Sequence, residues 1–107
     1  MDPLEESLIA IQKLRDVSPD KVNAYLSFTN KVKSESAIGE KERALINVAL
    51  AMHSKCSECI SFNVNDAIES QASKDEIIDA ALLAVAMGGG SIMMYMKILI
   101  SELEAFD

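Results

Sequence analysis

Two cysteines form the one group in the sequence whose residue types and spacing point to chemistry. The segment Cys56-Ser57-Glu58-Cys59 is a C-x-x-C pair at the expected start of a helix. Sulfurs three residues apart in a first helical turn lie close enough to form a small disulfide ring. The unpaired N–H groups and the positive end of the helix dipole favour a thiolate on Cys56. Lys55 acts in the same direction, and Glu58 opposes it. The pattern predicts a redox-active dithiol.

Two other interpretations of this pair stay open. A C-x-x-C can be half of a zinc or iron–sulfur site, but closure usually needs four ligands. The chain has two cysteines and one histidine, and His53 lies at a plausible spacing. We therefore expect no metal and no cofactor within one chain, although ligands shared between subunits, or Glu58, would complete a metal site. In the other interpretation, both cysteines are buried and pack as small apolar residues.

The elements that must position the cysteines are predicted to be helices, without a sheet. Sustained polar–apolar alternation and Asn-Gly or Asp-Gly hairpin pairs are missing from the sequence. Proline follows a capping serine at Ser18-Pro19, and Ser73 with Glu76 forms a capping-box pattern. We predict an all-α, single-domain bundle over residues 1–107, with helices at about 4–17, 19–33, 40–52, 56–70, 73–88 and 92–106.

Hydrophobic residues make up 50% of the chain, and many of them fall in the third and fifth expected helices. These two helices are apolar on nearly every face, which is typical of helices buried on all sides. A domain of 107 residues has too few other helices to enclose both. We expect the surplus to be buried between subunits. The Gly88-Gly89-Gly90 run is expected to end the fifth helix and to let the next helix pack closely against it. The methionines around this run are expected to fill an irregular core or a subunit contact; they are Met87, Met93, Met94 and Met96.

The charge balance excludes several classes of partner. Acidic residues number 17 against 10 basic ones, for a net charge of −7. Nucleic acids and anionic membranes need a concentrated basic surface, so neither is expected. The acidic start of the chain does not resemble a secretory leader, and the longest uncharged stretch, 80–96, is shorter than the roughly 20 residues that span a bilayer. We predict a cytoplasmic protein whose cysteines are normally kept as thiols.

Three further segments, together with the cysteine pair, resemble a known protein family. The likeness rests on residues 41–46, on 56–60, on Ala67 and on 72–80. These segments are similar to the carboxymuconolactone decarboxylase and alkyl hydroperoxidase D family, over about residues 40–90. The resemblance implies an all-helical fold and the association of copies as trimers or hexamers.

The family pattern assigns roles around the dithiol, and two of its positions have changed in this chain. Redox-active members carry an acidic residue twelve positions before the first cysteine and a histidine four positions after the second. The histidine relays a proton, and the acidic residue orients it. Ala44 and Asn63 occupy these positions here. By the family pattern Cys59 would attack a peroxide and Cys56 would resolve it by forming the disulfide. An amide is not a base near neutral pH, so we expect slow peroxide turnover.

Two side chains are candidate substitutes for the missing relay. His53 lies in the turn before the cysteines, and Glu42 belongs to the third expected helix. Lactone decarboxylation is not expected, because a dianionic lactone calls for clustered arginine or histidine. The chain offers only Arg15, Arg43 and His53.

The resemblance therefore implies a thiol-dependent oxidoreductase with Cys56 and Cys59 as its catalytic pair. It would reduce a small peroxide, as an antioxidant peroxidase does, or exchange with a disulfide, and a thiol reductant would restore it. The alternative is a non-catalytic, oligomeric family member that acts as a binding or assembly module.

Overall fold

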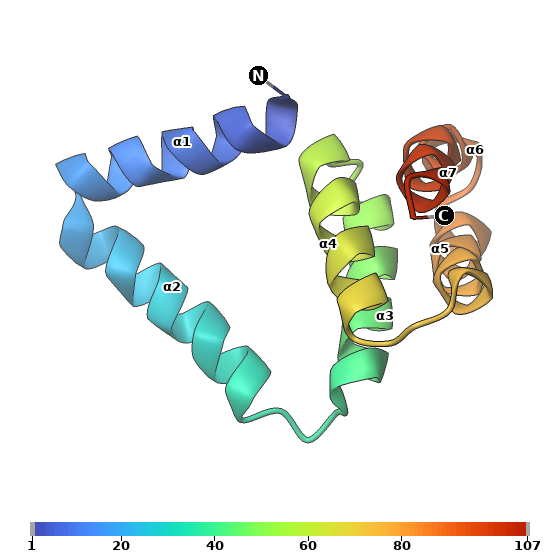
Figure 1. Cartoon of the computed structure of the whole chain (residues 1–107), viewed down its shortest axis with the longest axis horizontal. Helices are drawn as coiled ribbons and strands as arrows, with labels where there is room; N and C mark the ends of the chain where they lie inside the picture. The colour runs from blue at the N-terminus through green and yellow to red at the C-terminus, as the bar shows by residue number, and fades with distance from the viewer. Residues whose placement is uncertain (1, 107) are drawn as a thin grey trace. The chain divides into compact units, whose positions relative to one another are not determined.

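The computed structural model describes residues 2–106, which form helices and no strand. The helices, drawn in Figure 1, are α1 (Pro3–Val17), α2 (Pro19–Ser34), α3 (Glu40–His53), α4 (Ser57–Glu69), α5 (Lys74–Gly88), α6 (Gly90–Met93) and α7 (Met96–Glu104). All six expected segments are helical, and the prediction of an all-α fold is confirmed. The last segment is divided between α6 and α7. The Tyr95 N–H donates to the Ile92 carbonyl at 2.9 Å, a tighter turn that interrupts the α-helical ladder.

The chain divides into two compact units, Met1–Gly39 and Glu40–Asp107. The first consists of α1 and α2. The Asp2 side chain caps α1 by accepting from the Glu5 N–H at 2.9 Å. Pro19 opens α2 as expected, but Ser18 caps it without a side-chain hydrogen bond. The prediction of one domain over residues 1–107 stays a prediction.

The first unit buries very little of its apolar surface. Val22 is its one buried residue among those that the structure describes. Its large exposed side chains are Leu8, Ile9, Ile11, Leu14, Val17, Tyr25, Leu26, Phe28, Val32 and Ile38. Two helices joined by one residue cannot enclose a core between them, so these side chains stay exposed within the unit.

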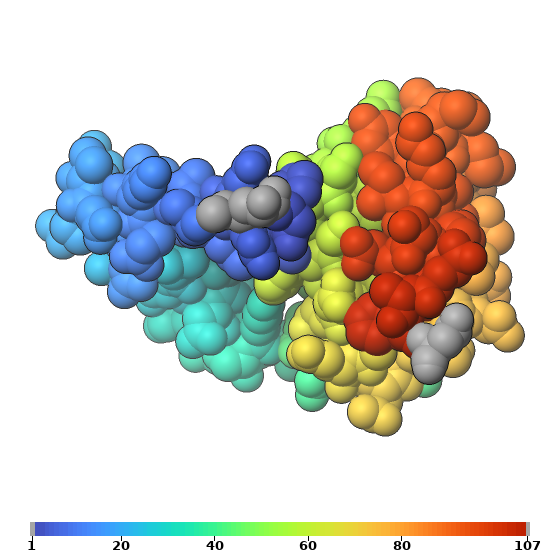
Figure 2. Space-filling model, turned by 45° about the horizontal axis from the view of Figure 1, so that its top comes forward, coloured from blue at the N-terminus to red at the C-terminus, as the bar shows by residue number. Residues whose placement is uncertain are grey.

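The second unit contains the hydrophobic core. The α3 helix packs against α4 and α5, and α7 lies along α4. Figure 1 shows α3 and α4 side by side, and Figure 2 shows the C-terminal segment against α4. Ile60 from α4, Ile77 from α5 and Leu99 from α7 are fully buried in this core. This arrangement holds the start of α4, where the cysteines lie, on a rigid framework.

The α3 and α5 helices are not buried on every side within the single chain, as the small number of other helices led us to expect. Ile46 and Leu50 on α3 are 45% and 58% exposed. Leu83 and Met87 on α5 are 69% and 87% exposed. The second unit has too few helices to cover both on all faces. Burial of these side chains between subunits stays a prediction.

The glycine run ends α5 and allows a close approach, as predicted. The α5 helix ends at Gly88, and Gly89 has a φ of 80°, in the left-handed region that favours glycine. A Cβ atom on Gly88 would overlap the side chain of Ile92, which is buried in the core. Of the methionines around this run, Met96 packs against the core, whereas Met87, Met93 and Met94 are exposed in the single chain. Met94 is 65% exposed, and Met87 more so.

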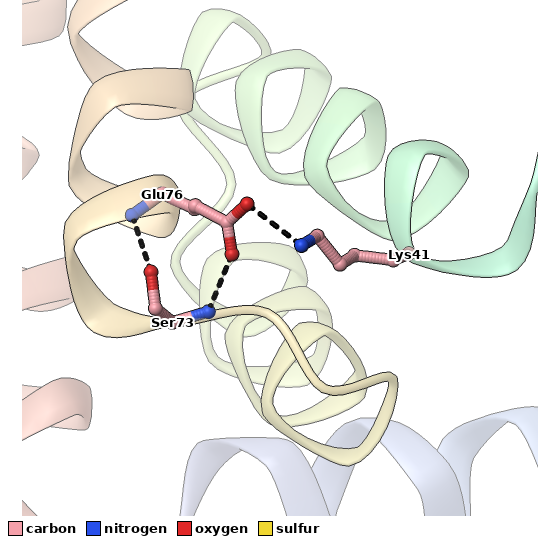
Figure 3. Close-up of polar contacts among 3 residues, drawn as sticks. All are labelled: Lys41, Ser73 and Glu76. Carbon is pink, nitrogen blue, oxygen red and sulfur yellow. Dashed lines mark hydrogen bonds and ion pairs between the residues drawn. The ribbon is translucent and has the colours of Figure 1, made fainter.

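A capping box starts α5 and connects it to α3, as drawn in Figure 3. The Glu76 N–H donates to the Ser73 hydroxyl at 3.1 Å, and the Ser73 N–H donates to the Glu76 carboxylate at 2.9 Å. The other Glu76 oxygen lies 2.8 Å from the Lys41 ammonium. The hydrogen bond from Lys41, followed by the one from the Ser73 backbone, lowers the pKa of Glu76 from its usual 4.5. The predicted capping box is therefore confirmed, and Glu76 also pairs with α3.

Replacement of Glu76 by glutamine is expected to lower the melting temperature at neutral pH but not at strongly acidic pH. The amide keeps an acceptor for the Ser73 N–H and loses the charge that pairs with Lys41. Because the pKa of Glu76 is lowered in the folded state, its contribution is complete above pH 4.5. It is lost as the pH falls through the folded-state pKa. Thermal unfolding between pH 7 and pH 2 tests this, and a constant difference between the two proteins would contradict it.

Candidate functional site

A tight turn between α3 and α4 brings the first cysteine to the start of α4. The Ser54 N–H donates to the Leu50 carbonyl at 2.9 Å, and the Lys55 N–H donates to the Met52 carbonyl at 3.1 Å. Lys55 has a φ of 56°, a left-handed conformation that reverses the chain after α3. Cys56 follows directly in an extended conformation and is the N-cap of α4. The helix predicted from Cys56 thus begins at Ser57.

The two cysteines are joined by a disulfide, with their Cα atoms 5.2 Å apart. The Cys56 sulfur also accepts a hydrogen bond from the Cys59 N–H at 3.3 Å. A sulfur at an N-cap therefore satisfies one of the free N–H groups of the first turn. Cys56 is partly exposed and Cys59 is exposed. In the single chain, this exposure does not fit the interpretation in which both cysteines are buried for packing.

The positions of the family's proton relay hold no acid or base. Ala44 is 2% exposed and packs in the core of the second unit. The Asn63 amide donates to the Cys59 carbonyl at 2.8 Å, one turn back along α4. The Asn63 side chain is thus hydrogen-bonded to the helix backbone. Neither Ala44 nor Asn63 provides a group that takes a proton from a thiol near neutral pH.

The two candidate substitutes for the relay, His53 and Glu42, lie at opposite ends of α3. His53 is the last residue of α3 and is exposed. Its ring Cδ2 lies 3.6 Å from the position that a Cβ atom on Gly88 would take, so it borders the end of α5. Glu42 is in the first turn of α3, eleven residues earlier, or about 16 Å along the helix axis. The structure brings His53 to the same end of the unit as the cysteines and does not bring Glu42 there.

A carboxylate on α7 forms a polar group with α4 that was not predicted from the sequence. One oxygen of Glu102 accepts from the Ser61 hydroxyl at 2.9 Å, and the other accepts from the Asn65 amide at 3.3 Å. All three residues are partly buried. Ser61 and Asn65 are one helical turn apart, which is a local signal, but their partner lies 41 and 37 residues further on. The group fixes α7 on α4.

No set of three or more histidine, cysteine, aspartate or glutamate side chains within residues 2–106 is arranged to hold a metal ion. None of the helices in this range is both long enough and apolar enough to cross a membrane.

Known proteins match this chain over most of its length. The sequence model of the carboxymuconolactone decarboxylase family matches residues 19–101. An uncharacterised protein of Cupriavidus necator is 22% identical over 94 residues, which cover 88% of this chain and 83% of that protein. Uncharacterised protein 4 in the cox locus of Paracoccus denitrificans is 26% identical over 85 residues, which cover 79% and 77%.

A solved structure extends this similarity to the fold. The crystal structure of the apo form of a carboxymuconolactone decarboxylase family protein from Legionella pneumophila superimposes with a TM-score of 0.87 at 27% identity. The match covers 95% of this chain and 91% of the Legionella protein. Sequence and fold thus point to the same family.

Proposed function

Because the chain belongs to the carboxymuconolactone decarboxylase family, we propose that Cys56 and Cys59 form a redox-active dithiol that exchanges with a disulfide substrate. The observation that carries this proposal is the place of Cys56 at the N-cap of α4, bonded to Cys59. The backbone places the two Cα atoms 5.2 Å apart, which lies within the range that a disulfide requires. The pair is also accessible from solvent, which an exchange reaction requires.

The helix start supports Cys56 as the attacking sulfur. In the reduced protein, the Cys59 N–H and the positive end of the α4 dipole stabilise a thiolate at the N-cap. The thiolate, not the thiol, is the nucleophile in disulfide exchange. Cys59 lies one turn further on and is the second thiol, which resolves the mixed disulfide.

The exchange proceeds in two balanced steps. The Cys56 thiolate attacks one sulfur of the substrate disulfide, forms a mixed disulfide, and releases the other substrate sulfur as a thiolate. Cys59 loses its proton to solvent and attacks the Cys56 sulfur. The Cys56–Cys59 disulfide forms, and the second substrate sulfur leaves. The substrate gains two electrons, and a thiol reductant, which is itself oxidised to a disulfide, supplies two further electrons that restore the Cys56–Cys59 dithiol.

Peroxide reduction is the slower reaction in this proposal. A peroxide must be attacked by a thiolate, and its leaving oxygen must receive a proton. The family pattern gives this work to Cys59 and the acid–histidine relay, but Ala44 lies in the core and Asn63 donates to a backbone carbonyl. In disulfide exchange the leaving group is a thiolate, which departs without being protonated, so the reaction needs no such relay.

Mass spectrometry of the reduced protein tests the proposed function. After incubation with hydroxyethyl disulfide, we expect the intact mass to fall by two hydrogens and the Cys56 and Cys59 peptides to be linked. The double variant Cys56→Ser/Cys59→Ser is the control and should not change in mass. Titration against a glutathione redox buffer then gives the reduction potential of the pair. Thiols that stay reduced in the folded protein, and react only after unfolding, would overturn the proposal and favour the non-catalytic alternative.

A further inference from the structure

A cavity of about 370 Å³ lies where the start of α4 meets the junction of α6 and α7. It is lined by Ser57, Met94, Tyr95, Lys97 and Ile98. Ser57 follows Cys56 directly in the chain, so the cavity lies beside the dithiol. Small-molecule sites have volumes of about 300–1,000 Å³. The cavity is therefore large enough for a small organic substrate of the cysteine pair.

The lining of this cavity combines apolar surface with one positive charge. Met94 and Ile98 supply aliphatic and thioether surface, and Tyr95 supplies an aromatic ring. Lys97 is exposed, and within residues 2–106 the structure gives its ammonium no carboxylate partner. The chain as a whole carries a net charge of −7, whereas Lys97 in this cavity and Lys55 before Cys56 place positive charge near the cysteines. An unpaired ammonium next to apolar surface fits a ligand with an apolar body and an acidic group.

We propose that this cavity binds the substrate disulfide, and that Lys97 selects substrates carrying a carboxylate. The apolar body lies against Met94 and Ile98, the carboxylate pairs with the Lys97 ammonium, and a substrate sulfur faces Cys56 across Ser57. This inference rests on the proposed function, because it names the substrate class for the same dithiol. Lys97 is a specificity residue here and takes no part in the bond exchange.

Exchange kinetics with two aromatic disulfides test the selection. The reduced protein is mixed with dithiobis(nitrobenzoate), which carries two carboxylates, or with the neutral dithiodipyridine, and the release of the aromatic thiol is followed by absorbance. The Lys97→Gln variant is expected to lose about fivefold in rate constant with the anionic disulfide, as an exposed ion pair allows. Its rate with the neutral disulfide should not change.

A second lysine provides the matched control for charge. Lys74 follows the opposite end of α4, so Lys74→Gln removes the same charge away from the cavity. We expect Lys74→Gln to keep the wild-type ratio of the two rates. An equal loss with both disulfides in Lys97→Gln, or the same loss of the anionic rate in Lys74→Gln, would overturn the selection by Lys97.

Ligand binding without sulfur chemistry separates this inference from the proposed function. The Cys56→Ser/Cys59→Ser variant is titrated with nitrobenzoate, or with the neutral nitrobenzamide, and backbone amide shifts are recorded by NMR. Saturable shifts at Ser57, Tyr95 and Ile98 are expected with the acid and should weaken in the added presence of Lys97→Gln. Their absence would overturn the cavity as an acid site even where exchange is observed. Their presence in a protein without exchange would support the cavity and reject only the redox function.

Discussion

Serine in place of Cys56 is expected to lower the rate of disulfide reduction by at least about a thousandfold, as loss of a nucleophile does. A serine hydroxyl is not ionised near neutral pH, so the start of α4 would have no thiolate to stabilise. Cys59 would remain exposed, but without the N-cap position and without a second sulfur to close the ring. Stopped-flow kinetics with a small aromatic disulfide measure this rate directly.

Serine in place of Cys59 is expected to have a different result, and this makes it the matched control. Cys56 still attacks at a rate within a few-fold of the wild type, but no second thiol releases the substrate. The protein should therefore accumulate a mixed disulfide at Cys56, visible as an increased intact mass. If Cys56→Ser reacted normally and Cys59→Ser did not, Cys59 would be the attacking sulfur, as the family pattern for peroxides has it.

Alanine in place of Gly88 is expected to lower the free energy of unfolding by about 1–3 kcal/mol, as overpacking of a core does. The new Cβ atom would overlap the Ile92 side chain, with the Ile92 Cδ1 atom at 3.2 Å and the His53 ring at 3.6 Å. Ile92 is 2% exposed and belongs to the core cluster, so a shift of its side chain would disturb the packing of that core. Urea denaturation monitored by circular dichroism gives the change.

Gly90 is the matched control for this substitution. It opens α6, and a Cβ atom there would meet nothing within 4 Å. Gly90→Ala is expected to leave stability unchanged or to raise it by up to about 1 kcal/mol, because alanine is the better helix former. A loss in Gly90→Ala equal to that in Gly88→Ala would show that the helix connection, and not the contact with Ile92, is responsible.

Local signals in the sequence predicted the features that depend on a few neighbouring residues. The Ser73–Glu76 capping box, Pro19 at the start of α2 and the end of α5 at its glycines are all present in the structure. Caps and helix ends are decided within three or four residues, so the chain alone contains the information. The same holds for Cys56 and Cys59, because their spacing within one helical turn brings the sulfurs together.

Contacts between distant residues could not be predicted in this way. Lys41 pairs with Glu76, 35 residues further on, and Glu102 binds Ser61 and Asn65 on another helix. A sequence pattern shows which face of a helix is polar, but not which helix will lie against it. The position of Glu42 could not be predicted for the same reason. Only the direction of α3 shows that this residue lies at the end away from the cysteines.

The sequence by itself thus determined an all-helical chain with a C-x-x-C pair at a helix start and without the family's usual acid and histidine. The tertiary structure decided what surrounds that pair. It placed Ala44 in the core, turned the Asn63 amide to a backbone carbonyl, and brought the α6–α7 junction with Lys97 beside Ser57. Helix caps are local, whereas a cavity exists only after helices far apart in sequence have packed together, and this is why the folded chain was needed to find one.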